Sequence, residues 1–392
     1  MRTIGVVTGS RADYGIYAPL LQEIVSAPSL ELALLVTGMH LSPEFGSTVA
    51  MIEADGFRVS ERVEMLLSSD SPEGIAKSMG LGTIGFAQVF DRRRPDLLVV
   101  LGDRFEMHAA AVAALPFKIP VAHIHGGEIT EGAFDDALRH SITKLSHLHF
   151  AATEEYSQRL IHMGEEPWRV TACGALSLDN LRTTKLLSRD ELAAKIGLSL
   201  EKPPLLVTFH PVTLEYEDTA WHVRELLEAL RLSELQIVFT MSNADTSGRG
   251  ITQMVNEFVK DRPSSRLVEN LGTQAYFSLM AVAAAMVGNS SSGIIEAMSF
   301  ALPVVNIGTR QAGRVRLENV IYVGYQRDDI MAGLRQALAP DTRARLQGRA
   351  NLYGDGFAAG RIVAKLKAVP LDSRLLRKRF SVAEDKAVRS SW

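Results

Sequence analysis

The sequence is poor in cysteine, in net charge and in long uncharged runs, and each shortage excludes a class of protein. Only one of the 392 residues is a cysteine, Cys173, so an internal disulfide is impossible and we expect a cytoplasmic protein. The 42 basic and 45 acidic side chains leave a formal net charge of −3, which argues against a nucleic-acid partner. The longest uncharged stretch, 270–295, carries polar side chains near its C-terminal end, so we expect no membrane span.

Short apolar runs alternate with longer amphipathic stretches over most of the chain. Such runs are typical of parallel strands covered on both faces by helices. The runs predict strands in two series, one at 4–8, 32–36, 97–101, 121–124 and 148–152, and another at 205–209, 237–240, 284–287 and 304–307.

A charged helical stretch at 189–196, followed by Pro203-Pro204, separates the two series. We therefore predict an α/β protein with two Rossmann-like, doubly wound domains that face a cleft. The predicted domains are 1–175 and 176–365, and 366–392 form a C-terminal tail. The basic cluster at 374–379 is interpreted as part of a solvated end.

Polar residues follow the predicted strands of the first half, where open α/β sheets bind their ligands. The loop at 8–15 leads into a helix and carries Arg11, which suits a phosphate group as well as it suits a tight structural turn. The next strand ends carry a group of acids and cations: Asp103, Arg104, His125, Glu128, Asp135 and Arg139. Carboxylates crowded in one site have pKa values that differ from one another, which suits acid and base roles.

Two histidine pairs, His123 with His125 and His147 with His149, have the alternate spacing that places both side chains on one face of a strand. A metal site is the alternative interpretation, but neither pair has the spacing of a metal-binding motif or a cysteine partner. We predict locally hydrogen-bonded histidines, with no metal and no cofactor.

The second half ends its strands with groups that suit an anion. His210 follows one strand, Asn243 follows the next, and Arg310 follows a third. Gly288–Gly293 places Ser290, Ser291 and free backbone amides at a helix start, where a pyrophosphate binds well, although Ser290 alone could serve as a helix cap. Glu296 lies one turn later and suits ribose hydroxyls. A sugar nucleotide, with its diphosphate on this half and carboxylates from the first half, fits these positions.

Taken together, the motifs resemble the hydrolysing UDP-N-acetylglucosamine 2-epimerases of sialic-acid and related nonulosonic-acid pathways. The resemblance rests on an ordered set that spans nearly the whole chain: TGSRADYG at 8–15, VTGMH at 36–40, GDR at 102–104, HIHGGE at 123–128, FDDALRHSITKLSHLH at 134–149, FHPVT at 209–213, GNSSSGIIE at 288–296 and NIGTRQAGR at 306–314.

This resemblance implies a glycosyltransferase-B-like fold and the conversion of UDP-N-acetylglucosamine and water to UDP and N-acetylmannosamine. The C2 proton is removed as UDP leaves, and water and a proton then add to a glycal-like intermediate. By position, the resemblance assigns catalysis to Asp103, Asp135 and His210, and UDP binding to Arg11, Ser290, Ser291, Glu296 and Arg310, with Asn243 and Arg139 nearby. Arg104, beside Asp103, is also predicted to bind the substrate. It also implies a homodimer or homotetramer.

The chain departs from the family pattern at His125, where the sialic-acid enzymes carry a catalytic glutamate. Either His125 takes over the proton transfer, or Glu128 or Glu131 does. The departure also leaves two substrates open: UDP-N-acetylglucosamine, and UDP- or GDP-linked N,N′-diacetylbacillosamine, its 4-acetamido-6-deoxy analogue. A glycosyltransferase of the same fold and a non-catalytic nucleotide-sugar sensor are the remaining alternatives.

Overall fold

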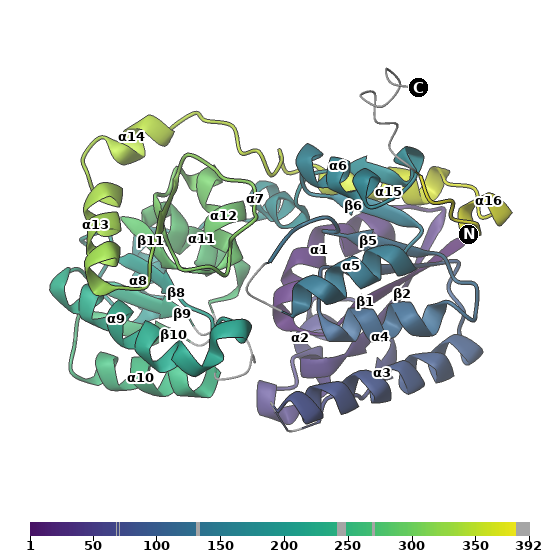
Figure 1. The fold of residues 1–392 in the computed structure, drawn as a ribbon, viewed down its shortest axis with the longest axis horizontal. Helices are drawn as coiled ribbons and strands as arrows, with labels where there is room; N and C mark the ends of the chain where they lie inside the picture. The colour runs from purple at the N-terminus through teal and green to yellow at the C-terminus, as the bar shows by residue number, and fades with distance from the viewer. Residues whose placement is uncertain (68, 70, 131–133, 241–247, 269–270, 382–392) are drawn as a thin grey trace, which may run out of the picture. The chain divides into compact units, whose positions relative to one another are not determined.

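The computed structural model describes the chain except residues 68, 70, 131–133, 241–247, 269–270 and 382–392 (Figure 1). It divides into two compact units. Unit 1 comprises Met1–Glu128, Asp135–Asp179 and Tyr353–Trp392, and unit 2 comprises Ile129–Phe134 and Asn180–Leu352.

Unit 1 is built on a parallel sheet of seven strands in the order β3-β2-β1-β4-β5-β6-β7. The strands are β1 (Arg2–Thr8), β2 (Leu30–Thr37), β3 (Val59–Val63), β4 (Leu97–Leu101), β5 (Val121–Ile124), β6 (Leu148–Ala151) and β7 (Val170–Ala172). The helices are α1 (Arg11–Ser26), α2 (Val49–Ala54), α3 (Pro72–Arg92), α4 (Phe105–Ala114), α5 (Asp135–Leu145), α6 (Glu154–His162), α15 (Ala358–Ala368) and α16 (Ser373–Leu376).

Both faces of this sheet are buried because successive strand residues point to opposite sides. Ile4, Val6 and Val99 pack with α1 and α15 in one core. Val7, Leu98 and Val100 pack with α3 and α4 in the other. The continuous apolar runs in the sequence are the consequence of this two-sided burial.

Unit 2 repeats the plan with a parallel sheet of six strands in the order β10-β9-β8-β11-β12-β13. The strands are β8 (Leu205–Thr208), β9 (Ile237–Thr240), β10 (Ser265–Val268), β11 (Ala285–Gly288), β12 (Val304–Ile307) and β13 (Val320–Val323). The helices are α7 (Asn180–Thr183), α8 (Arg189–Ile196), α9 (Thr219–Leu232), α10 (Gly248–Lys260), α11 (Gly272–Val282), α12 (Ser291–Ile295), α13 (Arg327–Ala337) and α14 (Thr342–Leu346). Its two faces pack against α9, α10 and α13 on one side, and against α8 and α11 on the other.

These sheets confirm the predicted α/β fold class, and every predicted strand is present. The strands that the sequence pattern missed are β3, β7, β10 and β13, which lie at the sheet edges. Their residues are mostly half-buried, so they lack the continuous apolar runs that mark the central strands.

Residues 353–381 pack into unit 1. Helix α15 lies beside α1 (Figure 1), and its residues Ile362 and Leu366 belong to the same core. Leu375 of α16 is 1% exposed. The predicted division at 365 differs from these units, because residues 353–365 belong to the first unit. Most side chains of Ser373–Ser381 are exposed, which fits the predicted solvated end, but Leu375 is buried and the segment makes specific contacts with unit 1 that are described below.

The strand order places one topological switch point in each unit, between β1 and β4 and between β8 and β11. Neighbouring parallel strands lead to helices on opposite faces there, which leaves a crevice beyond their carboxyl ends. In unit 2 this crevice requires Gly288, because its φ is +132° and an added Cβ would lie 1.9 Å from the Thr208 carbonyl oxygen. Within the described residues, no helix is long and apolar enough to cross a membrane.

Candidate active site

The loops after β1 and β4 bring predicted residues to the switch point of unit 1. Asp103 and Arg104 follow β4, and Arg11 is the first residue of α1. The loop before α1 is ordered by Asp13, a residue that the sequence analysis missed. The Asp13 carboxylate accepts hydrogen bonds from the Thr8 hydroxyl at 2.6 Å and from the Gly9 and Ser10 amides at 3.0 and 3.1 Å.

A buried chain of charges links β4, β5 and α5. Arg139 of α5 is 3% exposed and forms an ion pair with Asp103, and its second arm lies 3.4 Å from Glu128. The other oxygen of Glu128 lies 2.5 Å from His125 Nδ1. The structure therefore joins Asp103, Arg139, Glu128 and His125 in that order. The sequence assigned Arg139 to the substrate, whereas here its guanidinium holds two carboxylates.

His125 has an unusual backbone and a directed ring. Its φ is +63°, a left-handed conformation that is costly for a residue with a side chain, and its amide donates to the Phe150 carbonyl at 2.9 Å. Because a carboxylate only accepts, Nδ1 carries the proton shared with Glu128. The other ring nitrogen, Nε2, is buried and has no hydrogen-bond partner among the described residues. Such an orientation suits a general base.

Arg104 is held by Glu106, a fully buried carboxylate that the sequence analysis also missed. Two nitrogens of the guanidinium lie 2.8 and 3.1 Å from the two carboxylate oxygens of Glu106. An added Cβ at Gly9 or Gly38 would come within about 3 Å of the Glu106 side chain, so these two glycines leave the space it fills. Asp135 lies in the first turn of α5, four residues before Arg139 and therefore on the same side of the helix.

In unit 2 a buried amide, Asn289, organises the predicted anion site. Its Oδ1 accepts the His210 amide at 2.7 Å, and its Nδ2 donates to the His210 carbonyl at 2.8 Å. Its own carbonyl accepts from Arg310 at 3.1 Å and from Gln311 at 2.8 Å. Burial, and then the charge of Arg310, lower the pKa of His210 far below its usual value, so this ring is neutral.

Ser290 caps α12 by accepting from the Ser292 amide, and Ser291 opens the helix. Both hydroxyls remain only partly buried. Burial raises the pKa of Tyr276 to about 12, against the effect of hydrogen bonds with Ser292, Thr208 and Ser290, and the nearby Glu296 also raises it. Tyr276 is thus a protonated aromatic side chain beside the predicted diphosphate site. The predicted residue Asn243 lies outside the described residues.

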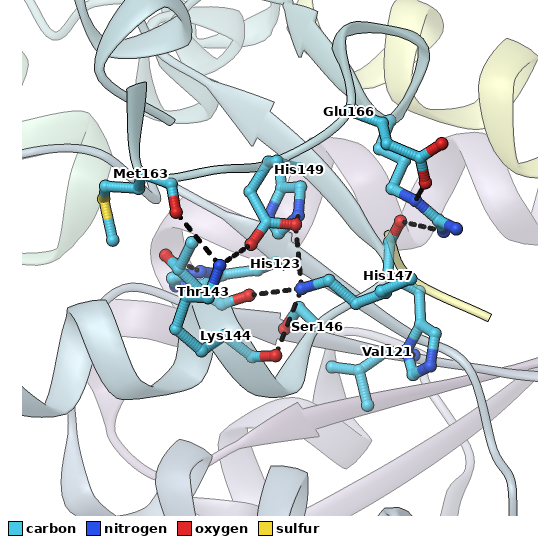
Figure 2. Close-up of polar contacts among 12 residues, drawn as sticks. Val121, His123, Thr143, Lys144, Ser146, His147, His149, Met163 and Glu166 are labelled. Atoms are coloured by element: carbon cyan, nitrogen blue, oxygen red, sulfur yellow. Dashed lines mark hydrogen bonds and ion pairs between the residues drawn. The ribbon is translucent and has the colours of Figure 1, made fainter. Parts of the chain in front are cut away.

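The two histidine pairs are hydrogen-bonded, as predicted; His125 bonds to Glu128, and Figure 2 shows the other three rings. His123 Nε2 donates to the Gly102 carbonyl at 2.7 Å, and its Nδ1 accepts from the Thr143 hydroxyl at 3.2 Å. His149 Nε2 lies 2.9 Å from Glu165, and His147 Nδ1 accepts the Val121 amide at 3.1 Å. Among the residues that the structure describes, no cluster of three or more His, Cys, Asp or Glu side chains is placed to hold a metal ion.

Two doubly wound units, each a parallel sheet with helices on both faces, define a glycosyltransferase-B-like fold. A sequence model of the family described as UDP-N-acetylglucosamine 2-epimerase matches residues 22–367. The chain belongs to this family, and it is a hydrolysing 2-epimerase of a nucleotide sugar.

Individual relatives agree with this assignment. The UDP-N,N′-diacetylbacillosamine 2-epimerase (hydrolyzing) of Legionella pneumophila is 40% identical over 378 residues, which cover 96% of this chain and 99% of that protein. The GDP/UDP-N,N′-diacetylbacillosamine 2-epimerase (hydrolyzing) of Campylobacter jejuni is 40% identical over 322 residues, which cover 82% and 84%. The crystal structure of a UDP-GlcNAc 2-epimerase from Neisseria meningitidis has the same fold, with a TM-score of 0.81 at 20% identity, covering 94% of this chain and all of that one.

The buried histidines predict a loss of stability in acid. Burial is the largest cause that lowers the pKa of His147, to about 4, whereas in the unfolded chain it is near 6.5. The unfolded state therefore binds the proton first, and stability is lost as the pH falls from about 6.5 to about 4. In His147→Asn the amide oxygen can still accept the Val121 amide but does not titrate.

We expect the free energy of unfolding of His147→Asn to fall less steeply over this range, by about 1.4 kcal/mol per pH unit for one proton. Denaturant unfolding of both proteins at several pH values measures the two slopes. Equal slopes would show that His147 does not titrate between the folded and unfolded states.

Proposed function

We propose that this hydrolysing 2-epimerase converts UDP-N,N′-diacetylbacillosamine and water to UDP and the free 2-epimer, with His125 and Asp103 as the groups that handle the C2 proton. The observation that carries the proposal is the buried chain from Asp103 through Arg139 and Glu128 to His125. It places two groups able to exchange protons at the ends of the neighbouring strands β4 and β5.

The reaction needs two proton transfers at one carbon. In the first half, a base takes the proton from C2, the C1–O bond breaks, and UDP leaves, which forms a double bond between C1 and C2. In the second half, the hydroxyl of water adds to C1 and a proton adds to C2 from the opposite face. The sum is substrate plus water to UDP plus the 2-epimer, so the enzyme needs one proton-transfer group on each face of the sugar.

The geometry supports His125 over Glu128 as one of these groups. Glu128 is 2% exposed, and its two oxygens face His125 and Arg139, so it orients its neighbours. His125 Nε2 is the ring nitrogen that has no partner among the described residues, and a carboxylate behind an imidazole favours the protonated ring that forms when the ring takes a proton. Asp103, 24% exposed and held by Arg139, is the group we assign to the other face. Glu131 lies outside the described residues.

The departing UDP gains negative charge, and unit 2 carries the groups suited to it. Arg310 supplies a cation, and Ser290 and Ser291 supply hydroxyls at a helix start. His210 is neutral and can donate a hydrogen bond without adding charge. We assign Glu296 to the ribose hydroxyls and Arg11 and Arg104 to the phosphates, following the sequence analysis.

The substrate assignment rests on the two bacillosamine-specific relatives at 40% identity. The bonds made and broken at C1 and C2 are the same for UDP-N-acetylglucosamine, which differs at C4 and C6. That substrate is the second candidate, because the description of the matching family names it. A glycosyltransferase has no need for proton exchange at C2, so the His125–Asp103 arrangement disfavours that alternative.

Purified protein given each sugar nucleotide alone tests the substrate. We expect UDP release without any added acceptor, with kcat/KM at least about tenfold higher for UDP-N,N′-diacetylbacillosamine than for UDP-N-acetylglucosamine, a difference of about 1.4 kcal/mol. A coupled assay for UDP measures both. A preference for UDP-N-acetylglucosamine would overturn the substrate assignment, and release that depends on an acceptor would overturn the epimerase reaction.

Substitution of the proton-transfer groups tests their roles. His125→Gln and Asp103→Asn are each expected to lower kcat by about 10²- to 10⁴-fold, because each removes a proton carrier from the reacting centre. Asp135→Asn is also expected to lower kcat, since the family resemblance assigns Asp135 to catalysis. The Kd of UDP should change little, since the residues assigned to UDP lie mainly in unit 2. A variant blocked only in the second half should release UDP together with the glycal.

His162→Gln is the matched control, since His162 is exposed at the end of α6 and away from the charge chain. If His125→Gln kept full activity, His125 would not be the proton-transfer group, and we would assign that role to a neighbouring glutamate. Unchanged rates for both aspartate variants would refute the carboxylate assignment.

A further inference from the structure

The C-terminal strap, residues 374–381, is held in unit 1 by a buried arginine that has no part in the proposed chemistry. Arg169 is 1% exposed, and its guanidinium donates to the carbonyls of Leu375 at 2.8 Å, Arg374 at 2.9 Å and Arg377 at 3.1 Å. Two further bonds reach the His147 carbonyl at 3.1 Å and the Glu166 carboxylate at 2.8 Å. Glu166 thus neutralises the buried cation, and the three strap carbonyls that accept from it make the position of the strap specific.

Further contacts hold the strap at both ends. The guanidinium groups of Arg169 and Arg374 both lie over the Trp168 ring, at 4.2 and 4.8 Å from its centroid. At the other end, the Ser381 amide donates to the Gly164 carbonyl at 2.9 Å. The ring of Phe380 covers Gly164, where an added Cβ would lie 2.5 Å from it.

Between these ends, the strap places one ammonium group inside unit 1. Lys378 Nζ lies 2.8 Å from Glu165, 3.2 Å from the Thr143 carbonyl and 3.1 Å from the Lys144 carbonyl. An ammonium has three donors, and all three have an acceptor here. Glu165 is fully buried, and although burial opposes it, hydrogen bonds from His149, Lys144 and Lys378 lower its pKa to about 2.

The two carbonyls that accept from Lys378 belong to the last turn of α5, the helix that carries Asp135 and Arg139. The last carbonyls of a helix have no partner within it, and a cation there also offsets the negative end of the helix dipole. The strap lysine, together with the Ser146 amide that donates to the Thr143 carbonyl at 3.1 Å, thus caps the C-terminal end of the helix that carries Arg139, the residue that holds Asp103 and Glu128.

A second route connects the same helix turn to Asp103. The Thr143 hydroxyl bonds to His123 (Figure 2), and His123 bonds to the carbonyl of Gly102, the residue before Asp103. Gly102 has a φ of +73° and directs the chain from β4 to Asp103. Burial lowers the pKa of His123 to about 3, so the ring stays neutral and keeps this pattern of one donor and one acceptor.

We propose that Lys378 is a positioning residue of the epimerase: by capping α5 it fixes Arg139 and Thr143, and through both of them it fixes Asp103. The inference rests on the proposed catalytic role of Asp103. It assigns to the C-terminal strap a function in turnover, separate from the binding of UDP by unit 2.

Lys378→Met tests this, because methionine keeps the length and apolar volume but removes the three donors. We expect kcat to fall about 10- to 100-fold, since small displacements of a catalytic group have effects of this size, while the Kd of UDP stays within about twofold. Lys365→Met is the matched control: Lys365 donates to one backbone carbonyl, that of Trp168, at 2.9 Å and does not contact α5. The control should keep its kcat.

Chemical rescue separates positioning from a general loss of folding. The chain's single native cysteine, Cys173, is fully buried, and burial raises its pKa to about 12, so it should not react in the folded protein. Lys378→Cys should be impaired. Alkylation with 2-bromoethylamine forms a thioether that restores the ammonium, and should recover most of kcat, whereas alkylation with iodoacetamide should not.

Thr143→Val provides a second variant, since it removes the hydroxyl that bonds His123 and leaves the Lys378 contact intact. It should lower kcat in the same way. Hydrogen exchange of the α5 amides gives a readout independent of activity, and Lys378→Met should exchange faster there than the Lys365→Met control.

If the wild type turns over the substrate and Lys378→Met has the same kcat, the strap inference is wrong, and the proposed function is unaffected. Equal losses of kcat and of UDP affinity in that variant would also overturn it, since they indicate a general structural role. If the wild type released no UDP, the proposed function would be wrong. The hydrogen-exchange measurement would then test the strap inference alone: equal exchange of the α5 amides in Lys378→Met and in the Lys365→Met control would show that Lys378 does not fix α5.

Discussion

The ion pairs of Arg139 with Asp103 and Glu128 are the constraint on which the candidate active site depends. Asp103 and Glu128 follow neighbouring strands, and two carboxylates brought this close would repel each other without a cation. Removing one partner of a buried pair leaves an uncompensated charge, which costs about 3–5 kcal/mol. The guanidinium therefore fixes α5 against the ends of β4 and β5. Glu128, which it holds, in turn orients the His125 ring.

In unit 2, a neutral side chain, Asn289, orders the groups at the switch point. Asn289 forms a reciprocal pair of hydrogen bonds with the His210 backbone, and its carbonyl holds Arg310. An uncharged amide is suited to this place, because a carboxylate there would oppose the binding of a diphosphate. The two switch points thus differ in chemistry: unit 1 concentrates acids and a histidine, while unit 2 orders cations, hydroxyls and amides. The small net charge of the whole chain hides this difference.

The central strands and the residues that follow them were predictable, because burial on both faces of a parallel sheet leaves a continuous apolar run with a polar end. Asp103, His125 and His210 were found in this way. The edge strands were not, since β3 and β13 bury only part of their surface. Glu106 was missed because its role depends on two three-dimensional features that a sequence pattern does not show. These are its bidentate bond to Arg104 and the space that Gly9 and Gly38 leave for its side chain.

The contacts of the C-terminal strap could not be predicted from the sequence either, because they join residues that are far apart along the chain. A run of basic residues near a terminus is typical of a solvated end, and nothing in it indicates that Lys378 meets Glu165 or that Arg169 binds carbonyls more than 200 positions away. Such contacts arise from the return of the chain to the first core through α15, whose apolar face packs on α1. The spacing of apolar residues predicts that α15 is a helix, but it does not indicate that this helix packs on α1.

The proposed reaction requires that C2 of the sugar lose one proton and regain one on the other face. Turnover in deuterium oxide, with the released sugar analysed by NMR, measures this exchange. We expect one deuterium at C2 of the product in every turnover, and inverted configuration at that carbon. A product with hydrogen retained at C2, or with the configuration of the substrate, would contradict the proposed reaction.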